Sequence, residues 1–321
     1  MLYILCILFV CGLLFSGCGK KEGTEVRVGS LKGPTSMGIL FLMDRAERGE
    51  TGDIYRFHMA TGADELTALL AKGELDIALL PANVAAALYQ KTDGSVVAVD
   101  INTLGVLYLV TGTAEVSEAA DLRGKTVCLT GKGTTPEASL KYILEENGLS
   151  EGDYALEYKS EAGEVAAVLA EDPSAVGLLP QPFATAALQQ NKELKTVLDM
   201  NEEWKKTPDG NGSAMVTGVT VVRREFLEEH EETVRAFLEE HKNSAASINE
   251  DPETGAALAV KAGIVASEAV AEQAIPRCSL VCITGGEMQD MLSAYLEVLE
   301  EFNPELVGGA LPGEDFYFPG Q

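Results

Sequence analysis

Basic residues are scarce in this sequence. Its 321 residues include 24 lysines and arginines but 50 aspartates and glutamates, which gives a formal net charge of −26 at pH 7. A surface that binds nucleic acid must neutralise phosphates with clustered basic side chains, so we expect no nucleic acid partner. Surface solubility explains the acidity more simply than acid-based chemistry does.

Histidine and tryptophan are also rare, with three residues of the first kind and one of the second. The histidines are isolated in the sequence, and neither a Ser-His-Asp arrangement nor a metal-ligand spacing is visible. His230 and His241 belong to the charged segment 228–242, which we interpret as a solvated helix face. The sequence therefore predicts neither an enzyme nor a bound metal or cofactor.

The cysteines do not describe a disulfide framework. Of the six, two lie in the apolar N-terminal run and Cys18 follows it after two small residues. The remaining three are Cys128, Cys278 and Cys282, an odd number that intrachain pairs do not satisfy. Cys278 and Cys282 could be metal ligands, but no histidine or second cysteine pair lies near them in sequence. We therefore predict buried apolar thiols.

Only one long apolar run is present, at residues 2–15. A membrane span needs about 20 apolar residues, so this run better fits the core of a signal peptide. The small residues Ser16 and Gly17 precede Cys18, and a polar stretch follows abruptly. An ordinary buried N-terminal helix is the alternative. The segment resembles a bacterial lipoprotein signal, which implies removal of residues 1–17, acylation of Cys18, a tether over 18–24, and an extracytoplasmic protein anchored to the cell membrane.

From residue 25 onward, short β-branched runs alternate with helical patterns, which predicts an α/β architecture with mainly parallel sheets. The first series contains four predicted strands, at 25–31, 54–60, 76–80 and 95–101. The second contains five, at 106–111, 125–130, 154–159, 175–179 and 194–198. A polar loop at 207–213 closes the second series with strong turn residues. Two series of this length indicate two lobes.

The C-terminal third is predicted to be helical apart from strands at 217–223 and 279–284. Helices alone do not form another α/β lobe, so we expect them to pack on the first one. The first lobe would then comprise residues 25–108 and 217–321, and the second lobe residues 109–216. Two crossovers, near 108–111 and 216–218, would form a two-strand hinge beside a cleft.

Five segments occur in an order and spacing that resemble a known family. They are Leu31-Lys32-Gly33-Pro34-Thr35, Gly73 to Ala78 leading to Pro81-Ala82-Asn83, Asp121 to Lys125, Gly131 to Pro136, and Pro180-Gln181-Pro182. Over residues 25–300 the chain is similar to the solute-binding proteins of nitrate, sulfonate and taurine ABC importers, a group that includes binding proteins for thiamine-pyrimidine precursors.

The resemblance implies a periplasmic-binding-protein-like fold of type II, in which two α/β lobes close on one small molecule. It also implies a monomer without a cofactor, which delivers a small organic or anionic solute to an ABC permease served by a separate ATPase. An alternative ligand is a thiamine-pyrimidine precursor or another heterocycle. An alternative of another class is an enzyme on the same fold, as in the menaquinone pathway; such enzymes act inside cells, which the signal at Cys18 argues against.

Ligands of open α/β sheets bind beyond the carboxyl ends of the strands, where helix N-termini present free N–H groups. Both lobes have loops of this kind that combine glycine, hydroxyls and a lysine. The candidate ligand-binding residues are Lys32, Gly33, Pro34, Thr35, Ser36, Pro81, Ala82, Asn83, Thr103, Gly131, Lys132, Gly133, Thr134, Thr135, Gln181 and Thr217. The alternative for these loops is ordinary helix capping with solvated lysines.

Two further features bear on the ligand. Gly131-Lys132-Gly133-Thr134 lacks the spacing of a phosphate-binding P-loop, so ATP is not expected here. Gln181 is a neutral amide where many relatives carry an acid, which favours an uncharged or anionic ligand over a cationic one. Trp204 either forms an aromatic wall of the cleft or covers the edge of its lobe; the sequence leaves both open.

Overall fold

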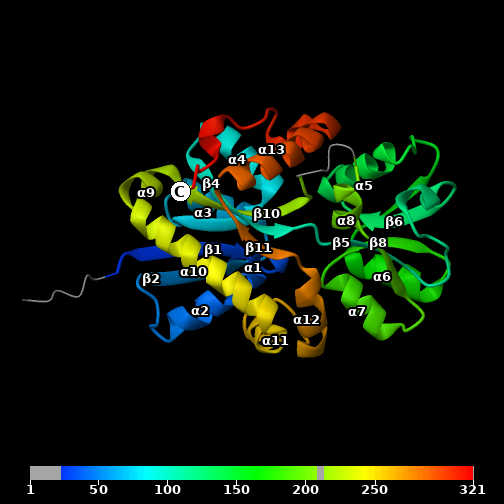
Figure 1. Ribbon diagram of the computed structural model, residues 1–321, viewed down its shortest axis with the longest axis horizontal. Coiled ribbons are helices and arrows are strands. Elements are labelled where there is room, and N and C mark those ends of the chain that lie inside the picture. Colours follow the sequence, from blue (N-terminus) through cyan, green and yellow to red (C-terminus); the bar gives the residue numbers. More distant parts are fainter. Residues whose placement is uncertain (1–22, 208–212, 321) are drawn as a thin grey trace, which may run out of the picture.

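A computed structural model describes residues 23–207 and 213–320, which form two sheets flanked by helices (Figure 1). The predicted signal peptide, Cys18 and most of the predicted turn at 207–213 lie outside the described residues. None of the described helices is long and apolar enough to span a bilayer. The α/β prediction and the division into two sheets are confirmed.

The first sheet has six strands in the order β11-β4-β10-β3-β1-β2. They are β1 (Glu25–Leu31), β2 (Ile54–Ala60), β3 (Ile77–Pro81), β4 (Val96–Leu104), β10 (Val216–Arg223) and β11 (Leu280–Ile283). Strand β1 pairs in parallel with β2 and β3, whereas β10 runs antiparallel between β3 and β4. Strands β3 and β4 are almost wholly buried, as strands covered on both faces must be. We call this sheet and its helices lobe 1.

The second sheet has five strands in the order β7-β6-β8-β5-β9. They are β5 (Leu107–Thr111), β6 (Thr126–Thr130), β7 (Ala155–Lys159), β8 (Val176–Pro180) and β9 (Lys195–Asp199). Strand β6 pairs in parallel with β7 and β8, and β5 runs antiparallel between β8 and β9. This sheet and its helices form lobe 2. The strands that enter from the other lobe, β10 in the first sheet and β5 in the second, thus run antiparallel to both of their neighbours; β11 also pairs antiparallel with β4.

The first crossover is short: β4 ends at Leu104 and β5 begins at Leu107, so only Gly105 and Val106 lie between the sheets. It therefore lies slightly earlier in the chain than the expected 108–111. A Cβ atom added at Gly105 would lie 2.7 Å from Cβ of Asn201 in lobe 2. This contact distance is too short for any side chain, so the crossover and lobe 2 pack closely only because residue 105 is glycine.

Helices cover both sheets. Lobe 1 carries α1 (Pro34–Met37), α2 (Leu40–Glu47), α3 (Ala63–Ala71), α4 (Ala82–Lys91), α9 (Arg224–Glu229), α10 (Glu231–Glu250), α11 (Pro252–Lys261), α12 (Glu268–Ala274) and α13 (Gly285–Phe302). Lobe 2 carries α5 (Thr135–Glu146), α6 (Ala162–Glu171), α7 (Phe183–Gln190) and α8 (Met200–Lys205). Helices α1 and α2 are separated only by Gly38 and Ile39.

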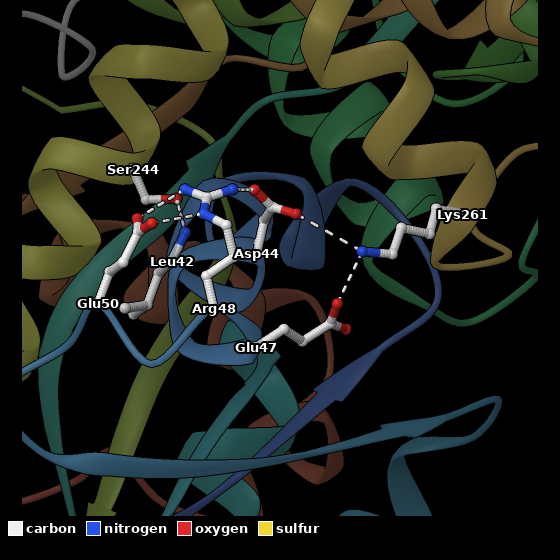
Figure 2. A network of polar contacts seen from close by, with 7 residues as sticks. All are labelled: Leu42, Asp44, Glu47, Arg48, Glu50, Ser244 and Lys261. Carbon is white, nitrogen blue, oxygen red and sulfur yellow. Dashed lines mark hydrogen bonds and ion pairs between the residues drawn. The ribbon is translucent and has the colours of Figure 1, made fainter.

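The C-terminal helices pack on lobe 1, as predicted. Figure 2 shows the contacts of α2 with α10 and α11: the Ser244 hydroxyl accepts a hydrogen bond from the Leu42 N–H at 3.1 Å. Lys261 of α11 lies 2.7 Å from a carboxylate oxygen of Glu47 and 3.5 Å from one of Asp44. These ion pairs are exposed and contribute little individually, so the buried apolar cluster between α1, α11 and α12 is the main cause of docking.

Candidate ligand-binding site

The carboxyl ends of the parallel strands in the two lobes face each other. In lobe 1, Pro81 at the end of β3 pairs with Gly218 of β10. In lobe 2, Pro180 at the end of β8 pairs with Leu107 of β5. The crossover of two residues joins the sheets at these same edges, so the loops beyond β1, β3, β6 and β8 lie at the joined ends of the two sheets. That these two groups of loops hold one ligand between them stays a prediction.

In lobe 1, Thr35 and Ser36 have different roles. The Ser36 hydroxyl is fully buried and hydrogen-bonds to the Ser30 hydroxyl and the Leu31 carbonyl, so it fixes the loop to β1. Thr35 instead packs toward β10: a Cβ added at Gly218 would lie 2.5 Å from its methyl group and 2.4 Å from the Asn102 side-chain oxygen. Glycine at 218 is therefore required for Thr35 to approach Asn102.

Three further candidates of lobe 1 keep polar groups available. The side chains of Asn83 and Thr217 are half-buried and have no hydrogen-bond partner among the described residues. The Lys32 ammonium is exposed and has no carboxylate within ion-pair distance in the described part of the chain. It would lie 3.6 Å from a Cβ added at Gly263, in the turn after α11. Thr103, by contrast, is fully buried and donates its hydroxyl to Asn102 at 2.9 Å.

The glycine-rich loop of lobe 2 is shaped by its own contacts. Gly131 and Gly133 have φ values of 82° and 73°, in the region that favours glycine. The Thr134 hydroxyl donates to the Gly131 carbonyl at 2.6 Å. The Lys132 ammonium lies 5.3 Å from the centre of the Tyr158 ring, a cation–π contact with β7. Two of the predicted ligand contacts in this loop are therefore engaged within lobe 2.

Glu137, at the start of helix α5, was not among the residues predicted from the sequence. Its buried carboxylate accepts a hydrogen bond from the Gly133 N–H at 2.7 Å and lies 3.0 Å from the Lys141 ammonium. Burial opposes ionisation, but the hydrogen bonds from Gly133, Lys141 and Tyr158 outweigh it and hold the pKa of Glu137 below its usual value. A helix N-terminus that we expected to attract a ligand anion thus already holds a carboxylate of its own.

Gln181 lies on the hinge side of lobe 2. Its side-chain oxygen accepts a hydrogen bond from the Thr185 hydroxyl at 2.8 Å, and its backbone N–H donates to the Val106 carbonyl of the crossover at 2.9 Å. Gln181 and Thr185 line a cavity of about 190 Å³ that is closed on the lobe 1 side by Gln273 and Arg277. The structure therefore places Gln181 beside the crossover, at the end of β8, the strand that neighbours β6 and its Gly131 loop.

Trp204 is buried where the lobes meet. It is 1% exposed, and its indole N–H donates to the Ser213 hydroxyl at 2.9 Å. Its ring lies 4.4 Å from that of Tyr142 in α5 and 5.4 Å from that of Tyr295 in α13. Helix α13 belongs to lobe 1, so this aromatic cluster joins the two lobes. In this structure Trp204 is an interlobe core residue, which matches neither of the roles expected from the sequence.

The prediction that His241 lies on a solvated face is wrong. His241 and Asp100 are both fully buried, and the His241 Nδ1 lies 2.9 Å from an Asp100 oxygen. The other Asp100 oxygen accepts from the Thr220 hydroxyl at 2.8 Å, and Thr220 in turn lies 3.3 Å from the Asn102 amide nitrogen. The charged residues flanking His241 concealed its burial, because only every third or fourth residue of α10 faces the core.

Cys282 completes this polar cluster, with its Sγ 3.9 Å from Asp100. Cys278 is buried among apolar residues as predicted, whereas Cys282 is half-buried and has polar neighbours. Ligand atoms of Asp100, His241 and Cys282 lie within 4.8 Å of one another. A metal-bound histidine normally donates its second N–H to an acceptor, but the buried His241 Nε2 has no partner. The cluster therefore fits a metal-free hydrogen-bond network better than a metal site.

The fold and the cleft define a two-lobe protein of the periplasmic-binding-protein fold. A protein from Parabacteroides distasonis described as an ABC transporter is 25% identical, with a TM-score of 0.78 over 93% of this chain and 100% of that chain. The periplasmic aliphatic sulphonate binding protein SsuA from Escherichia coli is 15% identical, with a TM-score of 0.72 over 94% of each chain. The periplasmic nitrate-binding protein NrtA from Synechocystis is 16% identical, with a TM-score of 0.52 over 74% of this chain and 66% of that chain.

These solved structures include sulfonate- and nitrate-binding proteins, as the resemblance in the sequence predicted, and they confirm the predicted fold class. At the sequence level, the family model described as menaquinone biosynthesis matches residues 40–274. The chain belongs to this family. No curated protein matches the sequence.

Proposed function

We propose that this protein is the extracytoplasmic solute-binding component of an ABC importer, anchored to the cell membrane through a lipid on Cys18. It captures a small organic or anionic solute between its lobes and delivers it to the permease. The observation that carries the proposal is the chemistry of the facing loops. Lobe 1 contributes Lys32 after β1, Asn83 at the start of α4 and Thr217 in β10, which can hold a solute by hydrogen bonds and charge.

The same loops lack the groups that catalysis would need. The three described histidines lie elsewhere: His241 is in the core, His58 is on β2, 2.7 Å from Glu65, and His230 lies between α9 and α10. Carboxylates near the cleft are engaged in capping: Asp199 accepts from the Asn201 N–H at 2.9 Å, and Glu137 accepts from the Gly133 N–H. A general base or a nucleophile with a positioned partner is therefore not found in the described part of the cleft.

The second candidate is an enzyme that acts on a menaquinone precursor in the same cleft. The family match over residues 40–274 favours it. The likeness of the whole chain to the Parabacteroides ABC transporter favours the binding protein. The predicted lipoprotein signal supports the binding protein as well, since capture at the membrane raises the effective concentration of loaded protein near its permease.

Trp204 provides the test of solute capture. It is the only tryptophan and lies between the lobes, so lobe closure should change its emission. The purified protein is screened against nitrate, bicarbonate, sulfonates, pyrimidines and related heterocycles by emission and by thermal unfolding. We expect at least one compound to raise the melting temperature and shift the emission without being consumed. If no compound stabilises the protein, or if a stabilising compound is turned over, the importer proposal fails.

The anchor is tested separately by Cys18→Ser. Wild-type cells grown with labelled palmitate should incorporate label into the protein and retain it in the membrane fraction. The variant should incorporate none. Labelling of Cys18→Ser equal to that of the wild type would contradict the lipid anchor and leave solute capture untouched.

A further inference from the structure

A polar cavity of about 190 Å³ lies between the lobes beside the crossover. Lobe 2 lines it with Gln181 and with residues of α7 and β9, and lobe 1 lines it with Gln273 of α12 and Arg277. Gln189, another lining residue of α7, donates to the Ala269 carbonyl of α12 at 2.8 Å, so the lobes touch here (Figure 1 shows α7 beside α12). Pockets for drug-sized ligands occupy about 300–1,000 Å³, so this interlobe cavity fits a smaller guest.

The interlobe cavity and most of the predicted solute loops lie on opposite sides of the crossover strands. In lobe 2, β5 separates β9 from β8 and β6, and in lobe 1, β4 separates β11 from β10, β3 and β1. The cavity is lined by Leu194 and Thr196 at β9 and by Arg277, shortly before β11. The loops after β1, β3 and β6 contribute none of its lining residues. Gln181 alone belongs both to the cavity and to the predicted ligand-binding residues.

Gln181 brings an unpaired donor to the interlobe cavity. The residue is 2% exposed, and its side-chain oxygen accepts from the Thr185 hydroxyl at 2.8 Å. Its amide nitrogen has no hydrogen-bond partner among the described residues, yet it is not one of the unpaired atoms that the protein encloses completely. This nitrogen therefore faces the cavity that Gln181 lines. An unpaired donor in a buried side chain is unfavourable, so a guest that accepts hydrogen bonds is stabilised there.

The charged residues of the lining are both cations, Lys192 from lobe 2 and Arg277 from lobe 1. Neither has a carboxylate within ion-pair distance in the described part of the chain. The Arg277 guanidinium donates to the Gln273 carbonyl at 2.7 Å, which leaves other N–H groups of its fork available. The net charge of −26 opposes an anion only weakly here, since charges beyond about 8 Å are largely screened at physiological ionic strength.

We propose that the interlobe cavity binds one small inorganic oxyanion, about the size of phosphate, which is not the captured solute. The anion accepts hydrogen bonds from the Gln181 amide and the Arg277 fork, and Lys192 supplies the second positive charge. Because one cation comes from each lobe, the bound anion links the lobes, and without it two like charges line the same cavity. Occupancy of the cavity therefore favours this arrangement of the lobes. The inference holds for a binding protein and for an enzyme alike.

The experiment is a calorimetric titration of the purified protein with inorganic phosphate. It compares the wild type, Lys192→Gln, Arg277→Gln and the control Lys195→Gln, which removes an exposed lysine of β9 that does not line the cavity. We expect the wild type to bind phosphate and each cavity variant to bind it about tenfold more weakly or less, because each loses a charged partner of the anion. Lys195→Gln should bind phosphate as the wild type does.

Each other outcome overturns the inference. A wild type that does not bind phosphate removes the site, and unchanged affinity in both cavity variants places the phosphate elsewhere. A loss in only one of them means that one lobe alone holds the anion. An equal loss in Lys195→Gln assigns binding to general surface charge. Solute capture is decided separately by the screen above, which contains no phosphate. Lys192 and Arg277 are exposed, so both variants should fold, and their melting temperatures verify this.

Discussion

Each lobe places a buried carboxylate behind its cleft loop, but the two carboxylates act differently. In lobe 1, Asp100 is deep in the sheet and is linked through Thr220 and Asn102 toward Thr35. In lobe 2, Glu137 reaches the loop itself and occupies the Gly133 N–H. Lobe 1 therefore leaves its loop donors available and holds its charge in the core, whereas lobe 2 uses its own charge to hold the loop.

The difference indicates that two similar loops have different roles, one held by the protein itself and one able to bind a ligand. A loop whose N–H already donates to Glu137 needs no ligand to complete its hydrogen bonds. The part of lobe 1 around Thr35 keeps polar groups that a ligand can bind. Similar residues in similar positions thus have different functions because different neighbours reach them. The following variants test this contrast, beginning with the largest expected effect.

Removal of His241, the partner of Asp100, should cause the largest loss in the free energy of unfolding. His241→Leu leaves a fully buried carboxylate without its nearest polar partner on α10, which should lower the free energy of unfolding by about 3–5 kcal/mol. His58→Leu is the matched control, because the pair of His58 with Glu65 is exposed and should be worth at most about 1 kcal/mol. Urea unfolding measures both. Equal losses of unfolding free energy would mean that burial does not make the Asp100 pair more stabilising than the exposed pair.

Loss of the Glu137 carboxylate in lobe 2 should lower the free energy of unfolding by less than loss of His241. Glu137→Gln keeps the size of the side chain but removes the charge that Gly133 and Lys141 bind, so we expect a loss of about 1–3 kcal/mol in unfolding free energy. Glu145→Gln, an exposed position on the same helix, is the control and should change stability little. If Glu137→Gln were as stable as the control, the carboxylate would not hold the loop.

The contribution of Glu137 should depend on pH in a defined direction. Its folded pKa is below the ordinary value of 4.5, so ionised Glu137 stabilises the fold fully above that value. The contribution is lost as the pH falls through the lowered folded pKa. The stability difference between wild type and Glu137→Gln should therefore be constant near neutral pH and shrink in acid. A difference that grew toward low pH would contradict the assigned direction.

The smallest effect concerns the threonines of the two loops. Thr35→Val should weaken binding of a solute found in the screen by about 1 kcal/mol, the value of one hydrogen bond. Thr134→Val should weaken it less, because the Thr134 hydroxyl already donates to Gly131. Calorimetric titration of both variants compares the loops directly. A larger loss of binding at Thr134 would mean that the lobe 2 loop contacts the solute more than the lobe 1 loop does. No loss at either position would mean that neither threonine contacts the solute.

Much of the fold could be predicted from the sequence, because strands and helices depend on local patterns. The predicted strand at 25–31 coincides with β1, and that at 54–60 with β2. The predicted loops follow the strands whose ends lie nearest the crossover, and their joint role in binding stays a prediction. What could not be predicted was how each side chain in those loops is used. Ser36, Thr103 and Thr134 are engaged with neighbours, whereas Asn83 and Thr217 are not, and no sequence pattern separates these two groups.

The sequence by itself determined the alternation of strands and helices, the two series of strands and the acidic, catalytically sparse composition. These follow from periodicity and residue type, which act over a few positions along the chain. Only the tertiary structure decided that His241 is buried with Asp100, that Trp204 joins the lobes and that Cys282 lies beside Asp100. Each depends on contacts between segments far apart in sequence: His241 and Asp100 are 141 residues apart. Burial and hydrogen-bond partners belong to the packed chain, because residues distant in sequence supply them.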